Sequence, residues 1–383
     1  MKAASAGCET EVSRRRMLKA GLAAAAVSAM GKPGDALSQN RDPGRQKATH
    51  STIPAGIRTI DIHAHYYPQS YFDVIAEQGQ RFGGVYRMTS QGPYIATPNA
   101  GGRGQLAPKF TDLKLRIADM DAQGIAVQAV SLTAPMVYWG DADFNHTLAR
   151  AWNDGASAAH ESYPARVVAL AILPMLDPDR AIDELNRASK LPGIRGVYMG
   201  TNINNKDLDD PLFEPIWTHI EQSGLPVFLH PLQTVGGERL EKYYLSNLLG
   251  NPVDGTIAAC HLIFGGVLDR HPKLQICLPH AGGALPILIG RIDHGWEVRP
   301  ETKSLPQAPS TYLERFTYDT ISHSRAVMEF VISQVGAERI MIGSDYCFDM
   351  GYDRPVRVVE ELNLSRAQRN MILGGTAARI LKI

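Results

Sequence analysis

Short apolar stretches alternate with amphipathic helical patterns along most of this chain, and several of the apolar stretches end in a polar residue. The apolar stretches have strand length and are rich in Val, Ile and Leu, as expected for parallel strands that are covered on both faces. They lie at 59–65, 126–132, 167–173, 194–199, 226–230, 274–280, 316–320 and 339–345. Helical patterns lie at 112–124, 144–161, 180–188, 211–223, 252–269, 325–335, 354–361 and 365–379.

This alternation predicts an α/β protein of the (β/α)8 TIM-barrel type. The segment 66–111 is rich in Gly, Pro and aromatic residues and shows no sustained period, so we expect a long insertion after the first strand. The helix that follows is expected to begin near Thr111-Asp112, which provides the N-cap, and Gly124 is its expected C-terminal stop.

Polar side chains that can bind a metal stand at the ends of four predicted strands. His63 and His65 end the first strand, and residues two apart in a strand point to the same side. His230 ends the fifth strand, His280 the sixth and Asp345 the eighth. Because the carboxyl ends of all barrel strands meet at one face, where the chemistry of this fold takes place, we expect the five side chains to converge.

Three imidazoles and a carboxylate, from His63, His65, His230 and Asp345, form a donor set that suits Zn²⁺, and Mn²⁺, Fe²⁺ or Co²⁺ also fit. His280 then remains as a base beside a water that the metal activates. Each residue alone has an ordinary explanation: a core histidine at 230, a helix cap at 280, an N-cap or ion-pair partner at 345. Their coincidence at one barrel face favours the metal site.

The N-terminus has the pattern of an export signal. A basic segment at 13–19, SRRRMLK, precedes a small apolar run at 20–30 that is too short to span a bilayer. The paired arginines resemble a twin-arginine signal, and Ala36-Leu37-Ser38 offers a cleavage site before Gln39. We therefore expect a signal peptide at 1–38, a linker at 39–57, the barrel at 58–383 and a periplasmic protein. The alternative is an incidental basic N-terminus.

The charge and cysteine composition gives no sign of a strongly charged partner or of a disulfide framework. Lys and Arg together number 39, as do Asp and Glu, so nothing predicts a nucleic-acid partner or a stable association with an anionic membrane. The four cysteines, Cys8, Cys260, Cys277 and Cys347, have neither CxxC nor zinc-ribbon spacing, and a disulfide framework is not expected. Cys277 lies in an apolar strand, where a buried free thiol is expected.

Several motifs together resemble the amidohydrolase superfamily, most closely its aminocarboxymuconate semialdehyde decarboxylase branch. They are IDIHAH at 60–65, LRIADMDAQG at 115–124, FLHP at 228–231, GGVL at 265–268, HPKL at 271–274, HAGGALP at 280–286, GRI at 290–292 and IGSDY at 342–346. By this resemblance the four proposed ligands match the zinc ligands of the family, and His280 matches the histidine that activates the metal-bound water.

The resemblance also implies a substrate and an assembly. Arg291 matches an arginine that reaches the partner subunit's active site and binds a substrate carboxylate, so a homodimer and a small carboxylate substrate are implied. The implied reaction is non-oxidative decarboxylation of an aromatic or unsaturated acid. The chain departs from the branch at 95–97, where a second carboxylate-binding arginine is replaced by Ile-Ala-Thr with Arg103 nearby, and at Leu232, where the branch has Trp.

Two other kinds of function remain open at the sequence level. The same metal and base could hydrolyse an ester, lactone or amide, and a non-catalytic metal-binding or small-molecule-binding protein is a third alternative. His294 and His323 flank loops at the predicted barrel mouth and are further candidates for substrate contact. The chain lacks a phosphate-binding loop and a serine nucleophile elbow.

Overall fold

The computed structural model describes residues 58–98 and 104–383. The expected signal peptide, the expected linker and Arg103 lie outside these residues.

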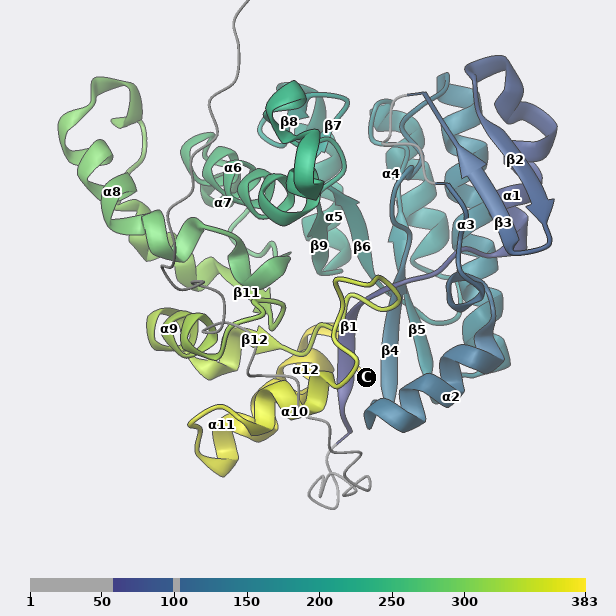
Figure 1. The fold of residues 1–383 in the computed structure, drawn as a ribbon. Helices are drawn as coiled ribbons and strands as arrows, with labels where there is room; N and C mark the ends of the chain where they lie inside the picture. The colour runs from purple at the N-terminus through teal and green to yellow at the C-terminus, as the bar shows by residue number, and fades with distance from the viewer. Residues whose placement is uncertain (1–57, 99–103) are drawn as a thin grey trace, which may run out of the picture. The chain divides into compact units, whose positions relative to one another are not determined.

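Eight parallel strands form a single sheet in the order β1-β4-β5-β6-β9-β10-β11-β12 (Figure 1). Their bounds are β1 Ile60–His65, β4 Val127–Ser131, β5 Val167–Ile172, β6 Ile194–Gly200, β9 Val227–His230, β10 Ile276–Leu278, β11 Phe316–Asp319 and β12 Ile340–Met341. Parallel bridges from Asp61 to Ile342 and from Ala64 to Tyr346 join the two ends of the sheet. The predicted (β/α)8 barrel is thereby confirmed.

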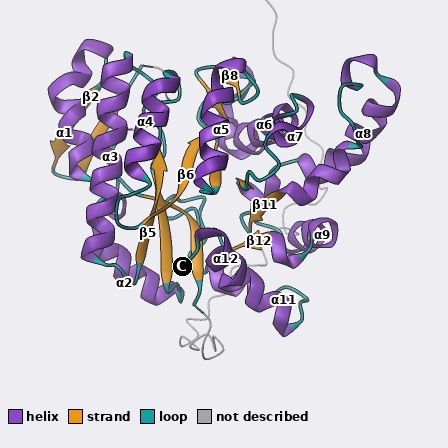
Figure 2. Ribbon diagram, turned by 180° about the vertical axis from the view of Figure 1, so that it is seen from behind, coloured by secondary structure: helices purple, strands orange, loops and turns teal. Residues whose placement is uncertain are grey.

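Helices lie outside this sheet (Figure 2). They are α2 Leu113–Gln123, α3 Ala142–Ser162, α4 Pro178–Ala188, α5 Glu214–Ser223, α6 Asn251–Phe264, α7 Val267–Arg270, α8 Leu285–Val298, α9 Arg325–Val335, α10 Pro355–Glu360, α11 Arg366–Asn370 and α12 Thr376–Leu381. Every residue of β1 and β5 is buried, which explains why these strands read as continuous apolar runs. None of the described helices is long and apolar enough to cross a membrane.

The ends of α2 follow the expected capping chemistry. The Asp112 carboxylate accepts from the backbone N–H groups of Lys114 at 2.8 Å and Leu115 at 3.0 Å. Gly124 ends the helix with a φ of 74°, a left-handed conformation that glycine adopts without strain. Among the described cysteines, Cys277 is buried and free, as predicted.

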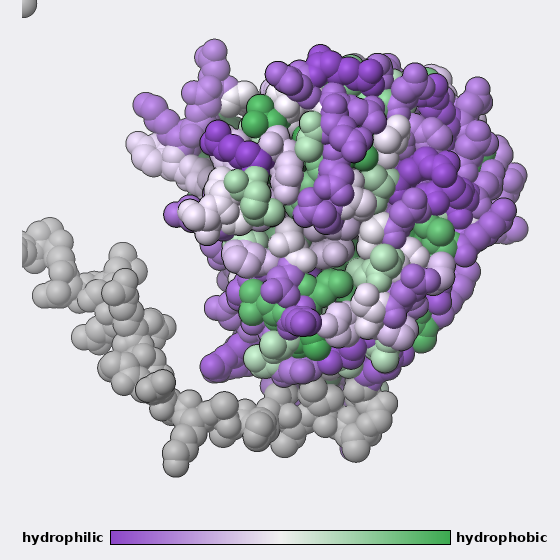
Figure 3. All heavy atoms as spheres, turned by 90° about the vertical axis from the view of Figure 1, so that its right-hand side faces the viewer, coloured by the Kyte–Doolittle hydropathy of each residue, from purple (hydrophilic) through white to green (hydrophobic). Residues whose placement is uncertain are grey.

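The insertion after β1 has more regular structure than its sequence indicates. It contains α1 Gln69–Gln78 and a hairpin of β2 Val85–Thr89 and β3 Gly92–Ala96. Both lie at the outer edge of the barrel beside α3 (Figures 1 and 2). The side of the molecule that carries the hairpin is mainly hydrophilic, with hydrophobic residues in small groups (Figure 3).

Three other boundaries differ from the sequence expectation. The stretches 274–280 and 339–345 were expected to be strands throughout, but β10 and β12 occupy only part of each. The single helix expected at 252–269 is divided into α6 and α7 because Gly266 is left-handed, with a φ of 70°. Helix α8 was not expected from the sequence; it lies at the periphery in Figure 1.

Candidate metal centre

Four buried side chains meet at the carboxyl end of the barrel. His63 and His65 come from the end of β1, His230 from the end of β9, and Asp345 from the turn after β12. One ligand atom from each of these residues lies within 4.8 Å of those of the other three. The structure therefore brings together the four residues that the sequence analysis selected as metal ligands.

Hydrogen bonds fix which nitrogen of each imidazole faces the cluster. The Nδ1 of His63 is 2.8 Å from an Asp319 carboxylate oxygen, and the Nδ1 of His230 is 2.8 Å from the Pro231 carbonyl oxygen. Because both partners only accept, each Nδ1 carries the proton and donates it. The Nε2 atoms are thus left as the ligands, and that of His63 is buried with no hydrogen-bond partner.

In His65 the partner that holds the proton on Nδ1 is a hydroxyl group. Ser131 Oγ donates to the Ala64 carbonyl oxygen at 3.1 Å and therefore accepts from the Nδ1 of His65, which is 3.3 Å away. The Nε2 of His65 lies 3.1 Å from Asp345 Oδ1. Three Nε2 atoms and one carboxylate oxygen, buried and directed at one point, fit a divalent metal ion.

A buried carboxylate beneath the cluster joins the first and last strands. Asp61 accepts from Ser344 Oγ at 2.6 Å, from the backbone N–H of Ser344 at 3.0 Å and from that of His63 at 3.1 Å. Gln128 donates at 2.8 Å to Oδ2 of this carboxylate, the oxygen that also accepts from Ser344 Oγ. These bonds hold the end of β1 against the turn that carries Asp345, so ligands from opposite ends of the barrel sequence keep a fixed spacing.

Arg116 of α2 extends this network. One guanidinium nitrogen donates to Gln128 Oε1 at 2.5 Å and another donates to the carbonyl oxygen of His65. The guanidinium lies 4.7 Å from the centre of the Tyr346 ring, a cation–π distance. This fully buried cation therefore stabilises the backbone on which two of the four ligands stand.

His280 lies next to the cluster without belonging to it. Its ring centre is 5.5 Å from that of His63 and 6.0 Å from that of His230. Its Nδ1 is buried and has no hydrogen-bond partner. Burial lowers the pKa of His280, which favours the neutral imidazole that can accept a proton.

A cleft of about 320 Å³ opens beside His280 and Asp345 and is large enough for a small organic acid. The other lining residues are Asn247, Leu248, Asn251, Pro252, Ala281, Gly283, Ile321, Ser322, His323, Val327 and Met350. His323, one of the two candidates for substrate contact, thus lines the cleft. His294 does not line this cleft; it is 72% exposed and pairs with Glu297 at 3.7 Å.

Arg291 lies on α8, exposed to solvent, and is not among the residues that line the cleft. Its helix also exposes Ile287, Leu288 and Val298, at 62%, 40% and 57%. The structure of one chain therefore does not bring Arg291 to the metal cluster.

Sequence reasoning missed Asp319, the carboxylate that contacts the metal ligand His63. It ends β11, is fully buried, and accepts from the Nδ1 of the metal ligand His63. The rule that identified the other residues, a polar side chain at the carboxyl end of a barrel strand, applies equally to this position.

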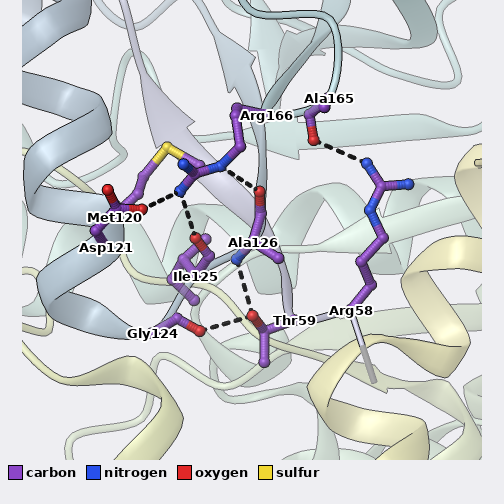
Figure 4. A pocket seen from close by; sticks show the side chains of 9 residues that line it. All are labelled: Arg58, Thr59, Met120, Asp121, Gly124, Ile125, Ala126, Ala165 and Arg166. Carbon is purple, nitrogen blue, oxygen red and sulfur yellow. Dashed lines mark hydrogen bonds and ion pairs between the residues drawn. The ribbon is translucent and has the colours of Figure 1, made fainter. Parts of the chain in front are cut away.

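A second cavity, of about 400 Å³, lies at the amino ends of β1, β4 and β5, away from this cluster (Figure 4). Thr59 Oγ donates to the Gly124 carbonyl oxygen at 2.6 Å and accepts from the backbone N–H of Ala126 at 2.8 Å. Arg166 donates to the Ala126 carbonyl oxygen at 2.8 Å. These hydrogen bonds connect the segments that precede β1, β4 and β5. They lie at the amino-terminal face of the barrel, which contributes to stability rather than to catalysis.

Comparison with known proteins places the chain in a family. Residues 60–383 match the Amidohydrolase family, and the chain belongs to it. The chain is 31% identical over 329 residues to 2-amino-3-carboxymuconate-6-semialdehyde decarboxylase of Dictyostelium discoideum, covering 84% of this chain and 91% of that one. It is 28% identical to gamma-resorcylate decarboxylase of Rhizobium sp. (strain MTP-10005), covering 73% and 90%.

A solved structure shows the same relationship. The 5-carboxyvanillate decarboxylase from Sphingomonas paucimobilis superimposes with a TM-score of 0.74 at 26% identity, covering 86% of this chain and all of that one. These comparisons confirm the resemblance to the amidohydrolase decarboxylases and the predicted class, a carboxy-lyase of that superfamily. The catalytic role of His280, the role of Arg291, the dimer and the export route remain predictions.

Proposed function

We propose that this protein is a metal-dependent, non-oxidative decarboxylase of a small aromatic or unsaturated carboxylic acid. The observation that carries the proposal is the position of His280, beside a buried four-ligand cluster and on a cleft of suitable size. Membership of the amidohydrolase family and similarity to decarboxylases support it.

Zn²⁺ is the proposed metal. Three imidazole nitrogens and one carboxylate oxygen match its ligand preference, and the same donors also accept Mn²⁺, Fe²⁺ or Co²⁺. When bound, the ion supplies a Lewis acid that polarises a substrate oxygen or activates water.

The side chains of this protein then have separate tasks. In decarboxylation the bond between the carboxylate group and the ring or alkene carbon that carries it breaks. CO₂ leaves, and the ring or alkene carbon takes up a proton. His280 is the residue that moves this proton, because its ring adjoins the cluster and lines the cleft. The apolar side chains of Leu248, Ile321 and Met350 give the substrate ring or alkene an apolar surface to contact.

The proposed active unit is a homodimer in which Arg291 binds the substrate carboxylate in the neighbouring site. Arg291 is exposed on α8 beside three exposed apolar side chains, an arrangement suited to burial against a second copy. A guanidinium holds a carboxylate through two parallel hydrogen bonds.

We also propose export by the twin-arginine route and processing near Gln39, which leaves a periplasmic enzyme. The paired arginines at 13–19 and the short apolar run at 20–30 support this assignment. The N-terminal sequence of the protein recovered from the native periplasm tests it: a mature chain starting near Gln39 is expected, and an intact N-terminus on cytosolic protein would reject it.

Product analysis tests the reaction. The zinc-loaded protein is incubated with a panel of hydroxybenzoic and unsaturated acids and, separately, with matched esters, lactones and amides. We expect loss of CO₂ from one or more of the acids. Formation of new acid from the esters, lactones or amides, with no CO₂ from any acid, would favour hydrolysis instead.

A further inference from the structure

Four N–H groups converge on the buried carboxylate of Asp319. Oδ2 accepts from the Nδ1 of His63 at 2.8 Å and from the backbone N–H of His280 at 3.0 Å. Oδ1 accepts from the backbone N–H groups of Ala281 at 2.8 Å and Ile321 at 2.9 Å. One side chain therefore contacts both a metal ligand and the backbone of the residue proposed to move protons.

The contact with His63 determines a tautomer. An ionised carboxylate only accepts hydrogen bonds, so the proton of the neutral imidazole must lie on Nδ1. The lone pair is then on Nε2, the atom that faces Asp345 at 3.6 Å. With the opposite tautomer, an N–H group would point at the metal position.

The contacts with His280 and Ala281 hold an unusual turn. Both residues have left-handed backbone conformations, with φ of 54° and 55°, although neither is glycine. Their successive N–H groups point to the same carboxylate, an arrangement in which backbone donors surround an anion. This turn, which follows β10, determines the orientation of the His280 ring relative to the metal ligands.

We propose that Asp319 is the positioning residue of the centre, which holds His63 in its metal-binding tautomer and turns His280 toward the same point. The proposal rests on the metal centre of the proposed function but not on the reaction. It can be tested, and rejected, even if the protein does not catalyse decarboxylation.

Asp319→Asn isolates this role. The substituted side chain keeps its shape but has an NH₂ group in place of one oxygen, so two of the four N–H donors then face a donor. If the NH₂ group faces His63, the imidazole must accept at Nδ1 and carry its proton on Nε2, which removes it as a ligand. If it faces Ala281 and Ile321 instead, the turn that carries His280 must move.

Metal affinity is the main readout, measured by competition of the purified protein with a chelator. Asp319→Asn should bind Zn²⁺ about ten- to a hundred-fold more weakly than wild type, the usual effect of losing a carboxylate partner of a ligand histidine. Glu184→Gln is the matched control: Glu184 is also fully buried, and it accepts from Asn153 and Arg187 instead of a metal ligand. Its affinity should be unchanged. An equal loss in Glu184→Gln would overturn the proposal. Wild-type affinity in Asp319→Asn would overturn it if residues 280–281 also keep their wild-type positions.

Two further measurements cover the remaining outcomes. In ¹⁵N NMR of zinc-loaded wild type, His63 should carry its proton on Nδ1; a proton on Nε2 would overturn the proposal even if the variant fails to fold. A crystal structure of metal-soaked Asp319→Asn should show His63 detached from the metal or residues 280–281 displaced. Wild-type positions for both would reject the positioning role.

Discussion

The Nε2 of His65 lies 3.1 Å from a carboxylate oxygen of Asp345, although the two residues are 280 positions apart in the chain. They meet because the first and last barrel strands are neighbours, joined by the bridge between Asp61 and Ile342. The closed barrel therefore places these two ligands side by side. Both side chains are buried, and a metal ion bound between them would offset the cost of placing the carboxylate there.

Replacing both His63 and His65 by Ala should abolish metal binding, because two of the four ligands are lost. Metal content of the purified protein, measured by inductively coupled plasma mass spectrometry, checks this. His294→Ala is the control, since His294 is 72% exposed and lies outside the cluster. Full metal content in the double variant would reject the site.

His280→Ala should retain the metal and lose the reaction. His280 is not one of the four ligands, so metal content should equal that of wild type. Loss of a positioned acid or base lowers kcat about 10²- to 10⁴-fold. Steady-state kinetics on fully loaded protein measure the effect, and a kcat equal to that of wild type would remove His280 from the mechanism.

Arg291→Ala should raise KM about ten-fold or more, because a hydrogen bond to a charged group contributes about 1.5–3 kcal/mol. Arg291→Lys should recover only part of the loss, since an ammonium group does not reproduce the paired hydrogen bonds of a guanidinium. Kinetics of both variants measure this, and an unchanged KM in Arg291→Ala would contradict the proposed role.

Mixed dimers test whether Arg291 acts across subunits. When Arg291→Ala and His280→Ala chains are mixed and allowed to exchange, one site per mixed dimer combines an intact His280 with Arg291 of the other chain. Activity should exceed that of either variant alone. No gain in activity, with mixed dimers shown to form, would place Arg291 in its own subunit's site or outside catalysis.

Acid should remove the stabilising effect of Glu214. The Arg270 guanidinium holds the pKa of Glu214 below its ordinary value, and His271 donates to the same carboxylate at 2.9 Å. A carboxyl group whose pKa is lowered by folding stabilises the protein above its unfolded pKa, about 4.3, and this stabilisation is lost as the pH falls through the lower folded value.

Urea unfolding at a series of pH values measures this effect. Wild type should be more stable than Glu214→Gln near pH 6. The difference should shrink as the pH falls below the unfolded pKa, about 4.3, and disappear once the pH is below the lowered folded pKa. Glu77→Gln, an exposed position on α1, is the control. A difference between wild type and Glu214→Gln that does not depend on pH would contradict the assignment.

The strand pattern was sufficient to predict the barrel and its four ligands because both depend on one rule of position. Each apolar stretch forms a strand of the barrel wall, and the polar residues at its carboxyl end lie at the barrel face where catalysis takes place. The same rule was not applied to Asp319, so the partner of His63 was missed. The exact bounds of β10 and β12 could not be predicted from the sequence. His280 and Asp345 lie in left-handed turns, and an apolar pattern does not reveal such turns.

Two helices escaped detection for a different reason. Helix α1 buries Tyr71, Phe72 and Ile75 against the rest of the fold, so its formation depends on tertiary packing more than on its own period. Helix α8 contains Gly290 and Gly295, which weaken a helical signal, and its exposed Ile287 obscures the polar face. Exposed apolar residues on α8 are also expected if this helix packs against a second copy of the chain.

The measurement that most directly tests the central claim is CO₂ release by one preparation in three states: purified with metal, stripped by a chelator, and reloaded with Zn²⁺. With an aromatic or unsaturated acid that the protein accepts, CO₂ should form in equimolar amount with the decarboxylated product, stop on stripping and return on reloading. The His63 and His65 double variant should remain inactive after the same reloading. CO₂ release that persists without metal, or that the double variant recovers, would contradict the account.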